Sequence, residues 1–457
     1  MLYYNDLLTI KNRGAPVKGS GTGVWVMKII KCSESGSLEQ LKALYDRPDC
    51  PKEIEQAVAA IVEEVRRDGD AAVCRFLKKF DSQNLTPAQL RVTEAEFEAA
   101  EKQLDQTSKD AIQLALSHIQ DFARHQMPKA WTYSPREGVV LGEQFTPMER
   151  VGCYIPGGTA PLVSTVLHTA GIAAAAGVKE IVAATPPKKD GTMHAATLYA
   201  MKAAGIREVY RMGGAYAIAA LAYGTATIPA VDKIVGPGNA YVAAAKKLVY
   251  GKVAIDMVAG PSEIMVVADS IARPEFIAAD MLSQAEHGSG LEQAVLVTDD
   301  PALPAKVQAE IERQKQLLTR QATVDRVLDH GVYMIVARSL AEALEIAGKY
   351  APEHLELMIA DAPAHAGEIK AAGAIFMGPW TPEPSGDFTA GPSHVLPTGG
   401  TARFFHGLSV MDFLRRSSLV QYTPDALKKE IPAIVRFAEM EGLDAHGRSA
   451  AIRGEKE

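Results

Sequence analysis

The sequence predicts an α/β fold with two doubly wound parallel sheets and a helical C-terminal tail. Short apolar runs alternate with Ala-rich helical stretches over residues 150–270, and a second alternating block covers residues 293–378. This βαβα rhythm is typical of parallel strands covered by helices on both faces. Residues 409–457 lack the alternation and have mostly helical character. We expect ligands at the carboxyl ends of the strands, where doubly wound sheets bind them.

Each expected element follows from the spacing of its apolar residues. In the first block we expect four strands, at residues 180–184, 209–210, 233–235 and 264–267. The helices between them are expected at residues 193–204, 215–222 and 240–249. The second block predicts strands at residues 294–297, 333–336, 356–359 and 374–376. Residues 38–125 precede both blocks and carry apolar side chains at helical spacing, so they are expected to be mainly helical.

These patterns divide the chain into four expected parts. The parts are an arm with a first helix (1–50), a discontinuous catalytic α/β domain (51–150 with 262–408), a cofactor-contacting α/β domain (151–261) and a helical tail (409–457). Met27, which Lys28-Ile29-Ile30 follows, is a second candidate start of translation beside Met1.

Composition and charge restrict the class of protein. The chain has 457 residues, a formal net charge of −7 and basic residues only in scattered pairs, which argues against nucleic-acid binding. The nearest candidate for a membrane span, residues 161–178, is interrupted by Ser164, Thr165, His168 and Thr169, so we expect none. Four cysteines without a CxxC pair predict neither a cysteine zinc site nor a disulfide framework. The polar N-terminal segment lacks a signal-peptide pattern, so the cytoplasm is the expected location.

Two glycine-rich turns are candidates for contact with a dinucleotide. No expected strand is followed by GxGxxG, so the two domains are Rossmann-like but incomplete. The first turn covers residues 154–161, and the second, residues 236–239, has the sequence Gly-Pro-Gly-Asn between a strand and a helix. The second position suits a phosphate or ribose at a helix N-terminus. A tight turn in which Asn239 only caps the helix explains the same residues equally well, so both interpretations stay open.

Polar residues in two further segments are candidates for metal binding and acid–base chemistry. Gln284 and His287 are three residues apart in an apolar helical run and share one helix face. An imidazole is a common zinc ligand, and an amide oxygen is a rarer one. Glu353 and His354 stand just before an expected strand, where the imidazole suits a general base and the carboxylate suits activation of water. Taken singly, ordinary polar residues at the end of an element explain each pair.

Asp387, Glu441 and His446 extend this set of polar residues. Asp387 lies in a Gly-rich loop, and its carboxylate suits completion of a zinc sphere. Glu441 and His446 lie in the tail and offer another acid and imidazole. With Gln284 and His287, these residues suggest a Gln/His/Asp/His sphere. A solvated loop or helix face is the alternative interpretation for each segment alone.

Together these segments resemble the histidinol dehydrogenase family. The resemblance covers roughly residues 30–450 with every motif in the same order, which is far more specific than one turn. The matching segments are Val-Gly-Cys-Tyr-Ile-Pro-Gly-Gly (151–158), Gly-Pro-Gly-Asn (236–239), Ala-Gly-Pro-Ser-Glu (259–263), Leu-Ser-Gln-Ala-Glu-His-Gly (282–288), Ala-Pro-Glu-His-Leu-Glu (351–356), Gly-Asp-Phe (386–388) and Glu-Gly-Leu-Asp-Ala-His (441–446).

The resemblance implies a four-electron oxidation of L-histidinol to L-histidine through L-histidinal, with two NAD and one water, at the end of histidine biosynthesis. It implies that His354 takes protons from the alcohol and that Glu353 activates water for the second oxidation. Zinc is implied to hold the imidazole and the amino group of the substrate. The implied zinc ligands are Gln284, His287, Asp387 and His446.

Substrate and cofactor contacts are implied in the same way. The implied substrate-binding residues are Ser262, Gln284, His287, His354, Asp387, Glu441 and His446. Tyr154 and Asn239 match NAD contacts, and Tyr216 stands where the family usually has a glutamine that touches NAD. A tyrosine can still stack on or bond to the cofactor, so Tyr216 is included among the expected contacts. The family forms homodimers with an intertwined tail, so we expect Glu441 and His446 to serve the partner's site.

Two other functions compete with histidinol oxidation. One is a related zinc- and NAD-dependent dehydrogenase of another small alcohol, as in sulfopropanediol dehydrogenase, which shares the metal and cofactor machinery. The other is a zinc hydrolase in which Glu353 activates a metal-bound water and no NAD binds. The hydrolase leaves the turns at Tyr154 and Asn239 unexplained. The carboxylate of Glu441 favours a cationic or imidazole-bearing substrate over another polyol.

Overall fold

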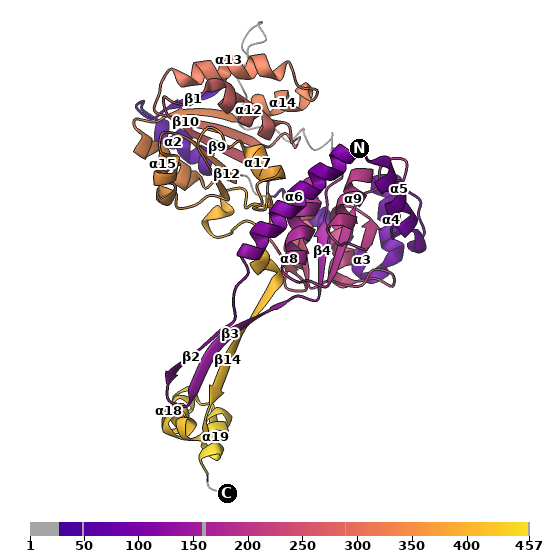
Figure 1. The fold of residues 1–457 in the computed structure, drawn as a ribbon, viewed down its shortest axis with the longest axis vertical. Helices are drawn as coiled ribbons and strands as arrows, with labels where there is room; N and C mark the ends of the chain where they lie inside the picture. The colour runs from indigo at the N-terminus through magenta and orange to yellow at the C-terminus, as the bar shows by residue number, and fades with distance from the viewer. Residues whose placement is uncertain (1–26, 48–49, 158–160, 288, 456–457) are drawn as a thin grey trace.

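The computed structural model describes residues 27–455, apart from 48–49, 158–160 and 288. The chain forms two α/β lobes and a long arm that carries the C-terminal helices away from both lobes (Figure 1). The expected α/β class with two parallel sheets is confirmed. Residues 1–26 of the expected N-terminal arm lie outside the described residues.

The first lobe contains a parallel six-stranded sheet in the order β1-β11-β10-β9-β12-β13. Its strands are β1 (Lys28–Lys31), β9 (Glu263–Ala268), β10 (Gln293–Thr298), β11 (Val332–Val336), β12 (His354–Met358) and β13 (Ala374–Met377). Every residue of β9 and β12 is buried, because helices cover both faces of the sheet. One face carries α12 (Pro274–Ala285), α13 (Leu303–Lys315) and α14 (Gln321–Leu328), and the other carries α2 (Ser37–Tyr45) and α15 (Leu340–Tyr350).

The second lobe contains a parallel five-stranded sheet in the order β6-β5-β4-β7-β8. Its strands are β4 (Arg150–Tyr154), β5 (Glu180–Thr185), β6 (Glu208–Arg211), β7 (Lys233–Val235) and β8 (Ala254–Ile255). The helices that alternate with them include α9 (Ala195–Ala203), α10 (Gly214–Tyr223) and α11 (Ala240–Val249). These bounds match the expected strands and helices of the first alternating block closely, because each element carries its own apolar pattern.

The helices between residues 52 and 125 pack on the second lobe. They are α3 (Lys52–Asp68), α4 (Asp70–Asp81), α5 (Glu94–Gln103) and α6 (Gln106–His125). Val58 and Val65 of α3 share one buried cluster with Leu221 of α10. The expected division instead joined residues 51–150 to residues 262–408. In the structure the apolar face of α3 packs on α10 and α11, and the division into domains stays a prediction.

The arm is an antiparallel three-stranded sheet that leads to two helices. It consists of β2 (Trp131–Arg136), β3 (Val139–Pro147) and β14 (Leu414–Tyr422), followed by α18 (Pro424–Glu441) and α19 (Asp444–Ala451). The tail is therefore mostly helical, as expected for residues 409–457, and β14 is a strand in it that was not expected. Only the first residue of β14 is buried, so this strand has no alternation of buried and exposed positions from which it could be predicted.

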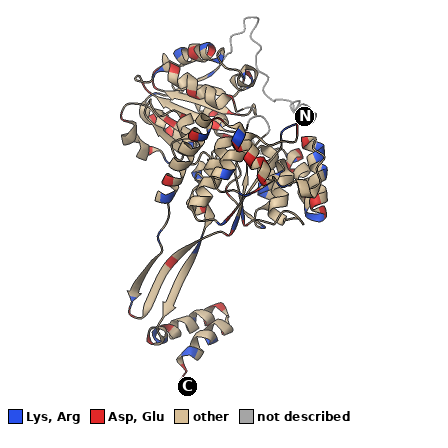
Figure 2. Cartoon of the chain, turned by 45° about the vertical axis from the view of Figure 1, so that its right-hand side comes forward, with Lys and Arg blue, Asp and Glu red and all other residues tan. Residues whose placement is uncertain are grey.

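Charged side chains of both signs are interspersed over the helices of the two lobes (Figure 2). Among the described residues, no helix combines the length and the apolar character that a membrane crossing requires.

Candidate active site

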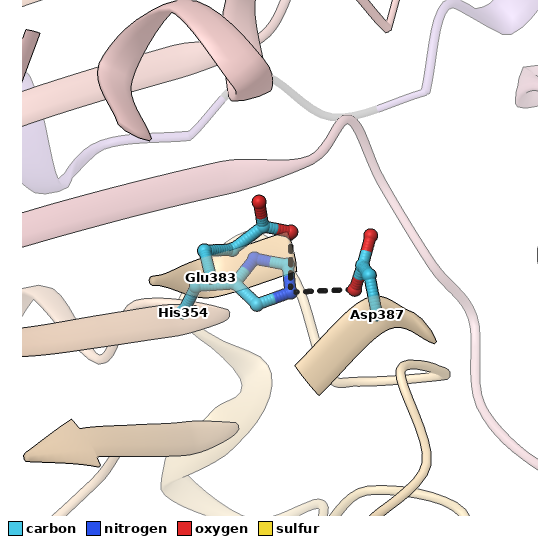
Figure 3. Close-up of side chains that lie close together, drawn as sticks. All are labelled: His354, Glu383 and Asp387. Carbon is cyan, nitrogen blue, oxygen red and sulfur yellow. Dashed lines mark ion pairs between the residues drawn. The ribbon is translucent and has the colours of Figure 1, made fainter. Parts of the chain in front are cut away.

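His354, Glu383 and Asp387 form a compact polar cluster at the amino end of β12 (Figure 3). The Nε2 atom of His354 lies 3.7 Å from Oε1 of Glu383 and 3.6 Å from Oδ1 of Asp387. Both carboxylates come from the short helix α17 (Glu383–Phe388), where a spacing of four residues places them on one face. The ligand atoms of the three residues lie within 4.8 Å of one another, so they can hold a metal ion.

The backbone of Glu263, the first residue of β9, contacts both Glu353 and His354, the pair that the sequence suggested as catalytic. Backbone N–H of Glu263 donates to Oε2 of Glu353 at 2.8 Å, and backbone O of Glu263 lies 3.1 Å from Nδ1 of His354. Because a carbonyl oxygen can only accept, Nδ1 of His354 carries a proton and donates it. Nε2 of His354 is therefore the nitrogen that faces Glu383 and Asp387.

Burial and charge perturb the ionisation of this cluster. Burial raises the pKa of Glu353 to about 8, against the lowering effect of His354. Burial alone would lower the pKa of His354, but Glu353, Asp387 and Glu383 outweigh it and raise that pKa to about 10. Burial also raises the pKa of Glu383 to about 8, helped by Asp387. Three carboxyl groups thus surround one imidazole, an arrangement that favours an added cation.

Gln284 lies in the last turn of α12, buried completely. Neither its Nε2 nor its Oε1 has a hydrogen-bond partner among the described residues. A buried amide left unpaired costs about 1–3 kcal/mol, so a ligand or metal at its oxygen would relieve a real deficit. This observation fits the expectation that Gln284 is a metal ligand.

His287 follows α12 and lies within electrostatic reach of the cluster. The His287 side chain is exposed to solvent. The protein atoms around its ring lower the pKa of His287 by desolvation, and the carboxylate of Asp387 opposes this effect. The carboxylate of Asp387 thus acts electrostatically on His287, and Gln284 lies three residues before His287.

Glu441 and His446 are not brought to this cluster within one chain. They lie on α18 and α19 at the far end of the arm, both exposed, while α17 lies between the two lobes (Figure 1). Ser262 lies directly before β9, half-buried, and its backbone O accepts from the N–H of Gln293. The four expected zinc ligands are therefore not assembled by one subunit.

Glu383 and His168 are polar residues near the cluster that sequence reasoning missed. Glu383 could have been found from its spacing of four residues to Asp387. His168 belongs to a π-helical turn, Leu167–Gly171, of the second lobe, and its completely buried ring meets the ring of His394 with centroids 4.5 Å apart. The only sequence signal of His168 was a lone histidine in an apolar run, which does not indicate its partner.

The candidate site residues lie at opposite ends of the strands in the two sheets. Glu353 and His354 lie at the amino end of β12, and α12 brings Gln284 to the same edge of the six-stranded sheet. Tyr154 and the turn before Asn239 instead follow the carboxyl ends of β4 and β7. At the first sheet the candidate side chains come from the segments that enter the strands, so the position of the ligand there stays a prediction.

Tyr154 and Asn239 both have hydrogen bonds within the second lobe. The Tyr154 hydroxyl accepts from the N–H of Gly214 at 3.0 Å, and burial raises its pKa to about 12. Oδ1 of Asn239 accepts from the N–H groups of Tyr241 and Val242 at 3.1 and 3.2 Å and so caps α11. Asn239 therefore caps α11, and the interpretation of this turn as a phosphate- or ribose-binding turn stays a prediction.

Tyr216, which was expected to contact NAD, is buried in α10. Its hydroxyl already has a hydrogen-bond partner within the protein. Its hydroxyl donates to the carboxylate of Asp81 in α4, and its ring stacks on Phe76 and Phe80. Because the hydroxyl already has an acceptor in the protein, the structure gives it a packing role whatever it contributes to cofactor binding.

Two doubly wound lobes, with a carboxylate–histidine cluster at one and glycine-rich turns at the other, define a two-lobed α/β enzyme with a candidate metal centre. The sequence model for histidinol dehydrogenase matches residues 46–454, and the chain belongs to this family. It is 47% identical over 416 residues to histidinol dehydrogenase of Synechococcus sp., covering 91% of this chain and 96% of that one. It is 47% identical to the protein of that name from Geobacillus kaustophilus, with 93% and 96% covered.

A solved structure is similar over the whole fold. The crystal structure of histidinol dehydrogenase from Elizabethkingia anophelis superposes with a TM-score of 0.88 at 37% identity. The match covers 93% of this chain and 98% of that chain. The lobes and the extended arm are therefore features that a related protein has in a crystal.

Proposed function

We propose that the protein is an NAD-dependent histidinol dehydrogenase, which oxidises L-histidinol to L-histidine through L-histidinal in histidine biosynthesis. The observation that carries this function is the buried Glu353–His354 pair, fixed by the backbone of Glu263 beside the polar cluster. The reaction is inferred from membership of the family. The imidazole of His354 and the carboxyl group of Glu353 are groups suited to its first and second oxidation.

His354 acts as the base of the alcohol oxidation. With Nδ1 donating to the carbonyl of Glu263, Nε2 is the ring atom left to receive a proton from the substrate hydroxyl. The neighbouring carboxyl groups raise the pKa of His354 to about 10, and bound zinc would oppose this rise and favour the neutral imidazole that a base requires. NAD, when bound, would supply the acceptor for the hydride of the same carbon, so each oxidation would give one NADH. The first oxidation releases one proton and the second, with its ionised acid product, releases two. The aldehyde then needs water, and Glu353, with a raised pKa near neutrality, can accept a proton from it.

Gln284, His287 and Asp387 of one subunit, with His446 of the partner subunit, would hold zinc. The unpaired amide of Gln284 and the carboxylate of Asp387 fit this group. Zinc would supply a Lewis acid that fixes the imidazole and amino group of the substrate. In this assignment Glu383 stays outside the metal sphere, where it faces Nε2 of His354 and accepts from the hydroxyl of Ser283 at 3.0 Å.

The remaining substrate and cofactor contacts follow the family assignment. Ser262 and Glu441 would contact the substrate. Tyr154, Tyr216 and Asn239 would line the NAD site on the second lobe. None of the four cysteines, all of them described residues, forms a disulfide. This suits a reducing compartment, so we place the enzyme in the cytoplasm.

The arm supports a homodimer with shared sites. Its terminal helices expose large apolar side chains, namely those of Phe437, Met440, Leu443 and Ile452. An extended arm with such side chains in water favours contact with another surface. A second copy would cover them and would receive Glu441 and His446 at its own polar cluster.

A stoichiometry assay tests the proposed function. Zinc-supplied enzyme with L-histidinol and excess NAD should yield about two NADH per substrate, as expected for a four-electron oxidation. Absorbance of NADH with sulfopropanediol but none with histidinol would instead assign the related alcohol dehydrogenase. Hydrolytic activity without any need for NAD would assign the hydrolase.

A further inference from the structure

The turn between β7 and α11 has a backbone conformation that only glycine accepts easily. Gly236 has φ +118°, and a Cβ atom there would lie 2.2 Å from the backbone O of Tyr154. The turn is thus packed against Tyr154 at the end of β4. A shift of Gly236 would move both Tyr154 and the cap residue Asn239.

A buried ion pair holds both backbone groups of this one glycine. Nζ of Lys246 donates to the O of Gly236 at 2.9 Å, and Oδ2 of Asp256 accepts from its N–H at 2.7 Å. Lys246 and Asp256 also pair directly. Their side chains are 2% and 0% exposed, and Oδ1 of Asp256 takes a further N–H, from Met257, at 2.7 Å.

The pair is poorly suited to a purely stabilising role. Removing two charges from water costs several kcal/mol per ion, and an apolar pair of similar volume is often as stable or more stable. What an apolar pair cannot do is fix the N–H and the C=O of Gly236 at the same time. Glycine has the widest conformational freedom of any residue, so two charge-assisted hydrogen bonds have their largest effect on geometry at this position.

We propose that Lys246 and Asp256 are positioning residues that hold the Gly236–Asn239 turn ready to receive the pyrophosphate–ribose part of NAD. The inference rests on the proposed function, because it takes the turn as part of the NAD site. Neither side chain touches the cofactor. They act through Gly236, which sets the place of Asn239 and of the start of α11.

The test compares Lys246→Met with Lys247→Met in the zinc-loaded enzyme. Lys247 lies next along α11, is exposed and pairs with Glu55, so it is a matched control for loss of a lysine charge. Lys246→Met should raise the KM for NAD and the Kd for NADH about tenfold, the effect of one lost charge-assisted hydrogen bond. The KM for histidinol and the zinc content should stay within about twofold, and Lys247→Met should change none of these.

If Lys246→Met does not fold, Asp256→Asn tests the positioning role instead. Its amide oxygen can still accept the N–H of Gly236, so a smaller rise in the KM for NAD is expected, again without a change for histidinol. Equal loss for both substrates, or an unchanged Kd for NADH in a folded variant, would overturn the proposal. Wild-type enzyme that fails to oxidise histidinol would count against the proposed function instead, while titration with NADH would still test the turn.

Discussion

Nε2 of His354 lies 3.6 Å from the carboxylate of Asp387, although the two residues come from different elements of the first lobe. A second carboxylate, that of Glu383, lies at nearly the same distance from the same atom. One nitrogen is thus shared by two acids, of which only Asp387 was expected to be a metal ligand. The two acids can be separated by experiment.

Asp387 and Glu383 should differ in their effect on zinc. Asp387→Asn and His287→Asn are expected to lower the affinity of the enzyme for zinc by at least about 10–100-fold, because each removes a proposed ligand. Glu383→Gln should retain zinc and lose rate, because it changes only the surroundings of His354. Elemental analysis after dialysis measures the metal content. Loss of zinc in Glu383→Gln with retention in His287→Asn would show that the metal lies instead between His354, Glu383 and Asp387.

Glu353→Gln should separate the two oxidations. The amide oxygen can still accept the N–H of Glu263, so the fold of the pair is preserved, but an amide cannot take a proton from water. We expect the second oxidation to slow by about 10²–10⁴, so that the yield falls from two NADH per histidinol toward one. Single-turnover absorbance with trapping of the aldehyde measures this. An equal loss of both steps would assign Glu353 to the first oxidation as well.

The fold could be predicted from the sequence where an element carries its own apolar pattern. The strands β5, β7, β9 and β10 were found in this way, since each is buried on both faces. The strand β14 was missed because nearly all of it is exposed and its only support is its pairing with β3. Non-local pairing of an exposed strand leaves no local signal.

The candidate site could be predicted only as far as its motifs extend. Gln284, His287 and Asp387 were found from motifs that resemble a family. The contact of His168 with His394 was not, because it joins a helical turn of one lobe to a loop more than two hundred residues later. The same limit applies to Lys246 and Asp256, whose role follows from hydrogen bonds to a single backbone residue.

The buried contact of Tyr216 with Asp81 should make stability depend on pH. Burial raises the pKa of Asp81 above its ordinary value of 3.8, and the Tyr216 hydroxyl only partly opposes this. The folded state therefore binds the proton more tightly than the unfolded state, so the contribution of Asp81 to stability is greatest at low pH and falls as pH rises through the folded pKa.

Asp81→Asn should remove this dependence and keep an oxygen for the Tyr216 hydroxyl. Relative to wild type, the variant is expected to gain stability on going from about pH 4 to pH 7, as the wild-type group ionises. Tyr216→Phe should lose about 1–3 kcal/mol, because it leaves a buried carboxyl without its donor. Thermal unfolding at both pH values measures the effect, and a gain of Asp81→Asn at low pH only would contradict the sign.

Sharing of sites between subunits can be tested by mixing two inactive variants. Glu353→Gln blocks the second oxidation and His446→Asn removes a proposed zinc ligand, so neither homodimer should form histidine at an appreciable rate, and the activity to follow is the formation of histidine. If His446 serves the partner, a heterodimer of the two variants contains one intact site, with native Glu353 and native His446 contributed by different chains. Random reassembly makes half of the dimers heterodimers, so about a quarter of the wild-type activity should return. If each subunit used its own His446, both sites of the heterodimer would be defective and mixing would restore no activity.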